Sequence, residues 1–373
     1  MTTQSHSESS LSLRIKKTLT WGCAATVGVA VAAAVLVYVL SYHPKSVERL
    51  AVLGATNAPV LRPGQKLRVL TWNVQYMAGK NHRFFYEGGR DERPSPEEIE
   101  ATLAGVARVI REENPDVVML QEVDDGSRRT DNMDQLARLL ALLPAEYTQH
   151  VSAFYHKALF VPEPHILGSV AMKLVTLSKY RIREAVRRQL PLVPKDPLTR
   201  QFYFKRAILE ARFPVAGGKD FAVLNTHLDA WAAGTETMAR QTAFAQALLE
   251  QLEDAGCTWC LGGDFNLLPP GSAGQRLPQV ERALFNSVSE LTPLFARYPA
   301  VPGASETGGP DFARWFTHFS NRMPKPDRTI DYIFFSPLAK LGEHYVRQKD
   351  PGQADFLKLS DHFPVVVELT LPQ

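Results

Sequence analysis

The sequence predicts an α/β domain with mixed β-sheets, preceded by one apolar segment that is long enough to cross a membrane. Three observations support this: an uncharged stretch near the N-terminus, apolar strand-like runs that alternate with amphipathic helices, and neighbouring strands without long crossovers. The chain has 373 residues, of which 45% are hydrophobic and 22% charged. This composition excludes a collagen, a coiled-coil rod and a wholly disordered chain. Three cysteines are too few for a disulfide scaffold.

The uncharged stretch runs from Leu19 to Tyr42 and is rich in Ala, Val and Leu. As a helix it would extend about 36 Å, and the hydrocarbon core of a bilayer is about 30 Å thick. We therefore expect a transmembrane anchor over residues 19–42, a cytoplasmic tip over residues 1–18 and a linker over residues 43–66. A cleaved signal peptide is the alternative, although its apolar region is usually only about 7–15 residues long.

Positive charge is concentrated beside this stretch. Three basic residues precede it: Arg14, Lys16 and Lys17. A mixed set follows it: Lys45, Glu48 and Arg49. Because basic residues favour the cytoplasmic side, we expect a single-pass protein with a cytoplasmic N-terminus and an extracytoplasmic C-terminal domain. Residues 51–373 carry 37 basic and 37 acidic side chains, which excludes a generic polyanion binder.

The helices are predicted from caps and apolar periodicity. Ser95 is placed to cap a helix, with Pro96 at its first position and Glu98 completing a capping box. Asn114-Pro115 ends that helix, and two more helices are expected over residues 131–143 and 235–254. Apolar runs predict strands over residues 67–72, 116–120, 221–225, 258–262, 330–335 and 365–371.

Acids, amides and histidines gather at the ends of these strands. The clusters are Trp72-Asn73, Gln121-Glu122, Asn225-Thr226-His227, Gly263-Asp264-Phe265-Asn266, Ile330-Asp331-Tyr332 and Ser360-Asp361-His362. Burying such groups costs several kcal/mol unless they are paired or bind a metal. One of them alone, such as Asp331, is more often a structural acid. Six of them predict a functional site, because loops at strand ends converge on one face of an α/β fold.

The residue types indicate hydrolysis of a phosphoester. Carboxylates and amides are hard oxygen ligands, which favour Mg²⁺ or Mn²⁺ over zinc. His227 and His362 are candidates for acid and base beside such an ion. The sequence has no Gly-x-Ser-x-Gly nucleophile motif, no phosphate-binding Walker loop and no His-Glu-x-x-His zinc motif.

The six clusters, in this order, resemble the endonuclease/exonuclease/phosphatase superfamily. That family includes pancreatic-type deoxyribonuclease, apurinic endonucleases, inositol polyphosphate 5-phosphatases and neutral sphingomyelinases. The resemblance spans about residues 67–372, so residues 67–373 are expected to form the catalytic domain. It implies a four-layer α/β/β/α sandwich of two mixed sheets, with the site at one edge of both.

The resemblance also implies a metal centre. Glu122 would be the main ligand, with Asn73 and Asp361 beside the ion. Apurinic endonucleases have an acid two residues after the first Asn, and this chain has Gln75 there. That departure weakens an abasic-site activity and favours one strongly bound metal.

The catalytic roles follow from the same resemblance. Asp264 would orient or deprotonate the attacking water, and Asn266 would hold a phosphate oxygen. His362 would contact the scissile phosphate and would be oriented by Asp331. His227 would be the second histidine, as in the deoxyribonuclease, sphingomyelinase and 5-phosphatase branches.

We therefore expect a Mg²⁺- or Mn²⁺-dependent phosphodiesterase acting on a lipid head group or a small phosphodiester. Alternatives are a membrane-anchored endonuclease or exonuclease, with a nucleotide or nucleic acid as substrate, and an inactive membrane-tethered binding protein on the same fold. The expected partners are the membrane, through residues 19–42, and the phosphoester substrate.

Three further features are less specific. Residues 181–206 hold eight basic side chains, which predict a solvated loop and hairpin or, alternatively, a patch for anionic lipid or nucleic acid. Within that segment Arg206 begins a strand and is a candidate substrate contact. Cys257 and Cys260 are expected to be buried thiols, because three residues of strand separate them by about 10 Å. His318 is a further candidate for substrate contact.

Overall fold

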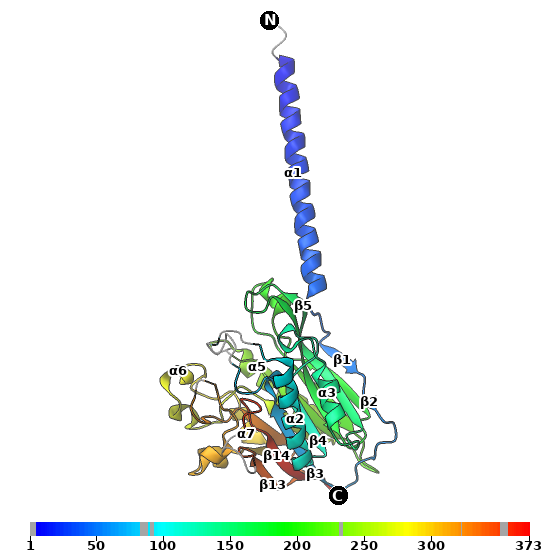
Figure 1. The fold of residues 1–373 in the computed structure, drawn as a ribbon, viewed down its shortest axis with the longest axis vertical. Helices are drawn as coiled ribbons and strands as arrows, with labels where there is room; N and C mark the ends of the chain where they lie inside the picture. The colour runs from blue at the N-terminus through cyan, green and yellow to red at the C-terminus, as the bar shows by residue number, and fades with distance from the viewer. Residues whose placement is uncertain (1–4, 83–88, 90–92, 231–233, 322, 351–356) are drawn as a thin grey trace.

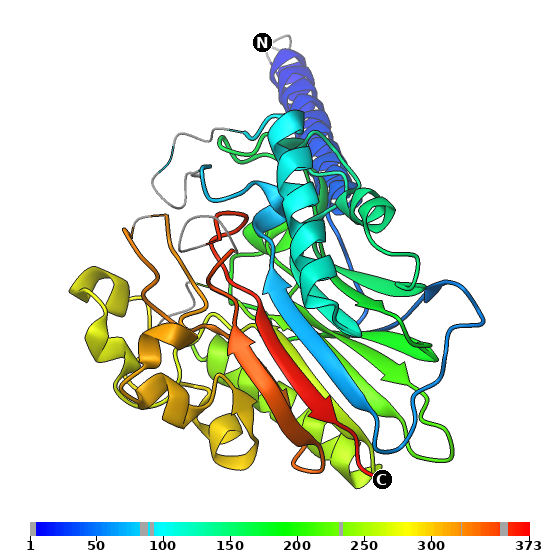
Figure 2. The same ribbon diagram turned by 60° about the horizontal axis from the view of Figure 1, so that its bottom comes forward.

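Two seven-stranded sheets pack face to face and helices cover their outer faces, which gives an α/β/β/α sandwich (Figures 1 and 2). The computed structural model describes residues 5–82, 89, 93–230, 234–321, 323–350 and 357–373, with side chains from residue 16 onward. This architecture confirms the predicted fold class.

The first sheet has the order β13-β14-β3-β4-β6-β5-β2. Its strands are β2 (Leu53–Gly54), β3 (Lys66–Asn73), β4 (Val117–Asp124), β5 (Gln149–Val161), β6 (Gly168–Ser178), β13 (Lys340–Val346) and β14 (Val365–Thr370). β3 and β4 are parallel, with Asn73 opposite Gln121. The other neighbours in this sheet are antiparallel. Parallel pairing therefore brings the ends of β3 and β4 to one edge of the sheet.

The second sheet has the order β1-β7-β8-β9-β10-β12-β11. Its strands are β1 (Val47–Leu50), β7 (Glu184–Gln189), β8 (Ala207–Phe213), β9 (Phe221–His227), β10 (Thr258–Asp264), β11 (Ala300–Val301) and β12 (Asp331–Phe335). Asp264 on β10 pairs with His227 on one side and with Asp331 on the other. Three candidate residues thus lie side by side at one end of three neighbouring strands.

One helix, α2, begins and ends where the sequence predicts caps, and α3 and α5 lie within the predicted ranges. The helices of the domain are α2 (Pro96–Glu113), α3 (Gln135–Leu142), α4 (Thr199–Phe202), α5 (Thr237–Asp254), α6 (Gln279–Arg282), α7 (Thr292–Arg297) and α8 (Ala304–Gly308). The 3₁₀ turns are η1 (Gln75–Met77), η3 (Arg128–Thr130), η4 (Ala273–Arg276) and η5 (Phe312–Trp315). The Ser95 hydroxyl accepts a hydrogen bond from the Glu98 amide at 3.2 Å, which confirms the capping box of α2. α2 ends at Asn114, whose φ of 48° is left-handed.

The core follows the alternation of side chains along the strands. On β9, Val223 packs in the apolar cluster between the sheets, whereas Leu224 packs in the cluster beneath α5 and α7. Two polar residues join the sheets inside this core. Gln121 donates from Nε2 to Asn225 Oδ1 at 2.8 Å, and Asn225 donates from Nδ2 to the carbonyls of Leu120 and Val175. These two residues of the sequence clusters are therefore structural.

The N-terminal helix α1 (Ser5–Leu40) projects away from the domain (Figure 1). Its segment Lys16–Leu40 is long and apolar enough to cross a membrane, and none of it is buried. A signal sequence near the N-terminus can pass the same test of length and composition, so the helix by itself does not separate the two expectations.

The segment predicted as a linker, residues 43–66, contributes one strand to each sheet. Within this segment β1 pairs with β7, and β2 pairs with β5. Leu61 is fully buried and bridges to Val215. Each strand is only two to four residues long, which is too short for a periodic signal in the sequence. As a consequence, α1 is attached directly to the domain edge.

The basic segment contains the predicted hairpin, formed by β7 and β8, and an exposed stretch over residues 194–200, but part of it is buried. Arg187 on β7 is fully buried and donates to the carbonyls of Phe154 and Lys205. Arg188 pairs with Glu210, and Arg183 pairs with Asp220. Much of the positive charge of residues 181–206 is therefore paired or buried within the protein. Cys257 and Cys260 are buried free thiols, as predicted.

Candidate active site

Glu122 reaches the site because its strand is irregular. β4 and β6 change register between Leu120 and Val123, and Glu122 adopts a φ of 59° there. Bulges of this kind re-aim a side chain, and left-handed backbone at a non-glycine residue is often found at functional sites. The carboxylate accepts a hydrogen bond from Asn73 Nδ2 at 3.1 Å. Burial raises the pKa of this carboxyl.

Asp264 lies at the centre of the cluster. Its Oδ2 atom accepts from Asn73 Nδ2 at 3.0 Å and lies 3.3 Å from His227 Nε2 and 3.6 Å from His362 Nε2. Its Oδ1 atom accepts from the Asn266 amide at 2.9 Å. Burial, together with the nearby Asp331 charge, raises the pKa of Asp264 to about 6. The carboxylate is thus held by four groups from four separate segments.

Gly263 allows this close approach. Its φ is 147°, and a Cβ atom there would lie 1.9 Å from the Thr226 carbonyl oxygen on the adjoining strand. Only glycine fits this position, because it lacks a Cβ and tolerates positive φ. The Gly-Asp cluster therefore combines a strand end with a tight backbone contact.

The two histidines differ in charge state. His362 Nδ1 lies 2.9 Å from Asp331 Oδ2. Burial lowers the pKa of His362, but the carboxylates of Asp331 and Asp264 outweigh it and raise this pKa well above its ordinary value. Burial lowers the pKa of His227, and the nearby Arg206 charge lowers it further. The site thus pairs a protonated imidazole with a neutral one.

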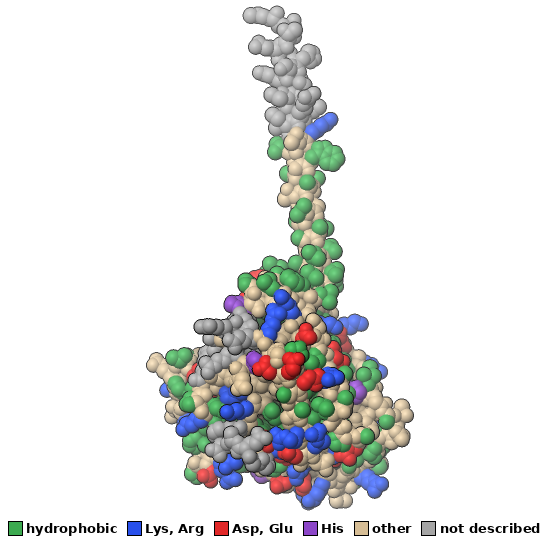
Figure 3. All heavy atoms as spheres, viewed as in Figure 1, with side chains coloured by type: hydrophobic (Ala, Val, Ile, Leu, Met, Phe, Trp, Pro, Cys, Tyr) green, Lys and Arg blue, Asp and Glu red, His purple; other side chains and the backbone are tan. Residues whose placement is uncertain are grey.

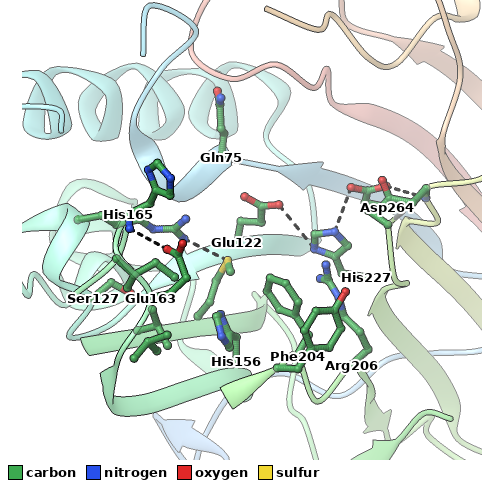
Figure 4. Close-up of a pocket in the computed structure, with 18 of the residues that line it drawn as sticks. Gln75, Glu122, Ser127, His156, Glu163, His165, Phe204, Arg206, His227 and Asp264 are labelled. Carbon is green, nitrogen blue, oxygen red and sulfur yellow. Dashed lines mark hydrogen bonds and ion pairs between the residues drawn. The ribbon is translucent and has the colours of Figure 1, made fainter. Parts of the chain in front are cut away.

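A cavity of about 890 Å³ opens over this cluster. Glu122, His227 and Asp264 follow one another along one side of it, and Arg206 and Phe204 lie next to His227 (Figure 4). The opposite side is formed by the turn between β5 and β6, which carries Glu163 and His165. Residues far apart in the sequence thus surround one space.

Arg206 offers a positive charge to this cavity. Its side chain is 4% exposed and lies between the rings of Tyr155 and Phe204, 4.9 and 4.4 Å from their centres. Its Nε atom is 3.7 Å from Asp229 Oδ1. Among the described residues, Nε and Nη1 have no hydrogen-bond partner. These unpartnered donors are suited to an anionic group in the cavity.

Comparison with known proteins agrees with this geometry. The model of the Endonuclease/Exonuclease/phosphatase family matches residues 70–362. The chain belongs to this family. No curated protein sequence matches the chain.

Several solved structures are similar to this chain, and the first shares its fold. An endonuclease/exonuclease/phosphatase from Beutenbergia cavernae DSM 12333 is 23% identical, covers 83% of this chain and 72% of its own, and has a TM-score of 0.55. TDP2 from C. elegans is 15% identical over 83% of this chain and 76% of its own, with a TM-score of 0.49. The catalytic domain of human Nocturnin is 17% identical over 86% of this chain and 96% of its own, with a TM-score of 0.48.

Members of the endonuclease/exonuclease/phosphatase family generally use divalent metals, and the donors in this chain fit a hard cation. Three of the five acidic residues that line the cavity belong to the predicted site: Glu122, Asp264 and Asp361. Ligand atoms of Asp264, Asp331 and His362 lie within 4.8 Å of one another, as do those of His318, Asp361 and His362. Glu122 belongs to neither group. Burial raises the pKa of Glu122 and of Asp264, and a divalent ion beside them would favour their charged forms.

Asn73 both accepts and donates hydrogen bonds. Its Oδ1 accepts from the Gln75 amide at 3.0 Å, and its Nδ2 donates to two carboxylates. In this arrangement Asn73 positions Glu122 and Asp264, and its role as a ligand stays a prediction. Gln75 is placed by the same turn, and its Oε1 accepts from the Asp361 amide at 3.1 Å. Gln75, which stands where apurinic endonucleases have an acid, thus fixes the backbone of the candidate ligand Asp361.

Two site residues were missed or only weakly indicated by the sequence. Arg129 pairs with Asp124 through two hydrogen bonds of 2.9 and 3.0 Å and lines the cavity. No local pattern singles it out, because its position depends on the turn η3. His318 packs edge-on against His362 with ring centres 4.7 Å apart. The other predicted residues all converge, with Asn266 and Asp361 lining the cavity and Asp331 behind His362.

Proposed function

We propose that this chain is a divalent-metal-dependent phosphodiesterase. The observation that carries the proposal is the surroundings of Asp264, which lies between two histidines and beside Glu122 in the wall of an open cavity. A carboxylate held in this way is suited to take a proton from an attacking water. A neighbouring imidazolium is suited to stabilise negative charge that develops on a phosphate.

Each residue of the cluster has a separate role in the proposed reaction. Asn73 and the Asn266 amide hold the Asp264 carboxylate in one orientation, so that it accepts the proton of the water. Asp331 holds His362 protonated, and His362 provides positive charge to the phosphate. Glu122 and Asp361 would hold the cation. A bound Mg²⁺ or Mn²⁺ ion would neutralise charge on the phosphate oxygens.

A phosphodiester suits this cavity better than a monoester. A monoester carries close to two negative charges at neutral pH, whereas a diester carries one. Glu122, Asp264 and Asp361 lie where the phosphate would bind, so the lower charge of a diester reduces repulsion. A large nucleic acid is less suitable, because Arg183, Arg187 and Arg188 are paired or buried, which reduces the basic surface that residues 181–206 offer to phosphates.

We further propose that α1 stays attached as an anchor with its N-terminus in the cytoplasm. The three basic residues before the apolar segment support this orientation. Protease added to spheroplasts should then digest the catalytic domain while the inner membrane is intact. Protection of the domain until the membrane is broken would contradict this orientation.

The enzymatic test uses the full chain in detergent with bis(p-nitrophenyl) phosphate and Mg²⁺ or Mn²⁺. We expect Asp264→Asn and His362→Ala to abolish most of the turnover. The matched control is His344→Ala. His344 lies on β13, away from the cavity, and pairs with Glu306 of α8. Equal turnover by the wild type and both site variants would contradict the proposal. Preferential hydrolysis of p-nitrophenyl phosphate would instead indicate a monoesterase.

A further inference from the structure

Four large apolar side chains are exposed around the turn between β5 and β6 and just before α4. We call them the apolar rim: Leu159, Phe160, Leu167 and Leu198, which are 64%, 40%, 48% and 60% exposed. The turn and α4 form one unit, because Phe202 of α4 packs against Ala158, Val161 and Val170. Exposed apolar patches of this kind mark a binding surface.

The apolar rim lies beside the end of α1. α1 ends at Leu40, and Ser41 pairs in antiparallel fashion with Ala158, the residue before Leu159. Apolar side chains continue from the helix onto the adjoining end of the domain (Figure 3). If α1 crosses a bilayer, its end and the apolar rim are at the same surface of that bilayer.

Charged residues flank the apolar rim. Lys157 precedes it, and Lys195 and Arg200 lie on either side of Leu198; all three are exposed. Asp196 is the exposed acid among them, and its carboxylate accepts hydrogen bonds from the amides of Leu198 and Thr199. Apolar side chains bordered by lysine and arginine are typical of a surface that lies in the head-group region of a membrane.

The cavity connects the apolar rim to the catalytic cluster. Its walls include Leu198 together with apolar side chains of the same unit: Val161, Ile166, Val170 and Phe202. The opposite wall holds Glu122, His227 and Asp264. A molecule that bridges the two walls needs a phosphate at one end and an apolar part at the other. A lipid phosphodiester has this construction.

We infer that the apolar rim docks on the outer surface of the bilayer that α1 crosses, so that the active site takes lipid phosphodiesters from that leaflet. This inference rests on the proposed phosphodiesterase function. The connection between α1 and the domain is short and paired in strands, which holds the cavity close to the membrane.

The kinetic test uses the full chain in proteoliposomes of phosphatidylcholine, phosphatidylethanolamine, phosphatidylglycerol, cardiolipin and sphingomyelin. Lipid hydrolysis is followed by ³¹P NMR, and soluble turnover is followed with bis(p-nitrophenyl) phosphate. We expect lipid hydrolysis by the double variant Leu159→Glu/Phe160→Glu to be at least about tenfold slower than by the wild type. A tenfold change corresponds to about 1.4 kcal/mol. Soluble turnover should change by less than about twofold, because neither side chain lines the cavity.

The matched control is Leu338→Glu. Leu338 is 63% exposed, nearly as much as Leu159, and follows β12 at the end opposite Asp331. It should leave both activities unchanged. Unchanged lipid hydrolysis in the double variant would overturn the inference. So would a wild type that hydrolyses the soluble diester and cleaves plasmid DNA but releases nothing from the lipids. A wild type inactive on the soluble diester would contradict the proposed function instead.

A second measurement tests docking without activity. A bimane label on Phe160→Cys, in a Cys23→Ala background, should be quenched by lipids that carry a doxyl group near the head group. Cys257 and Cys260 are buried and should stay unlabelled. The same label on Leu338→Cys should be quenched several-fold less. Equal quenching at the two positions would overturn docking by the apolar rim.

Discussion

The two walls of the cavity are built in opposite ways. The polar wall consists of Asn73, Glu122, His227, Asp264 and His362, and its side chains are held by one another and by strand register. The other wall comes from one turn and α4, and ends in the exposed apolar rim. The buried wall holds its side chains in one arrangement, as catalysis requires, whereas the exposed apolar wall is accessible to a binding partner. We therefore expect variants of the polar wall to change turnover of every substrate, and variants of the apolar rim to change turnover only at a membrane.

The largest effect is expected from Glu122→Gln. Loss of the charged oxygen removes the proposed main ligand, and about 4 kcal/mol of lost transition-state stabilisation corresponds to about a thousandfold lower kcat. Steady-state turnover of bis(p-nitrophenyl) phosphate is the measurement, with circular dichroism as a check of folding. Glu290→Gln, on an exposed loop, is the control. Turnover within threefold of the wild type would exclude Glu122 from the chemistry.

Asp331→Asn should have the next largest effect. The amide keeps the shape of the side chain but removes the charge that stabilises protonated His362. We expect kcat to fall about a hundredfold, the range of general acid–base assistance, with KM nearly unchanged. A change confined to KM would show that Asp331 serves binding rather than His362.

Arg206→Gln tests the cation at the border between the two walls. Its unpartnered donors are expected to bind the phosphate, and a hydrogen bond to a charged group contributes about 1.5–3 kcal/mol. KM for the soluble diester should therefore rise at least about tenfold. Arg183→Gln is the control, because Arg183 pairs with Asp220 at the surface. An unchanged KM in Arg206→Gln would leave this arginine with the structural role of pairing with Asp229.

The smallest effect concerns the stability of the apolar side. His156 is buried on β5 and bonds to the Phe202 carbonyl of α4 at 3.0 Å, and burial lowers its pKa to about 3. In the unfolded chain this histidine takes up a proton near pH 6.5. Folding is therefore disfavoured progressively as the pH falls from about 6.5 towards 3, by up to about 1.4 kcal/mol per pH unit.

His156→Gln should make the free energy of unfolding less dependent on pH over that range. Urea unfolding of the detergent-solubilised chain, followed by fluorescence at several pH values, measures this slope. An identical slope in the variant would show that His156 is protonated equally in the folded and unfolded states.

The polar wall could be predicted from the sequence, and the apolar rim could not. Asp264 and His227 stand at the ends of apolar runs, and parallel strands necessarily bring such ends together. Leu159 and Phe160 lie at the end of β5, where a register shift against β6 between Ala158 and Val161 breaks the alternation of side chains. Their role depends on the pairing of Ser41 with Ala158, which links segments over one hundred residues apart. β1 and β2 were not predicted for a similar reason, because they are too short for a periodic signal.

Metal dependence of phosphodiester hydrolysis is the most direct test of the central claim. The full chain is treated with EDTA, passed through a desalting column and assayed with bis(p-nitrophenyl) phosphate while Mg²⁺ or Mn²⁺ is added back. We predict that turnover falls to the uncatalysed rate after EDTA and returns along a saturable curve with added metal. Turnover that survives metal removal, or that never rises above the uncatalysed rate with either ion, would contradict the account.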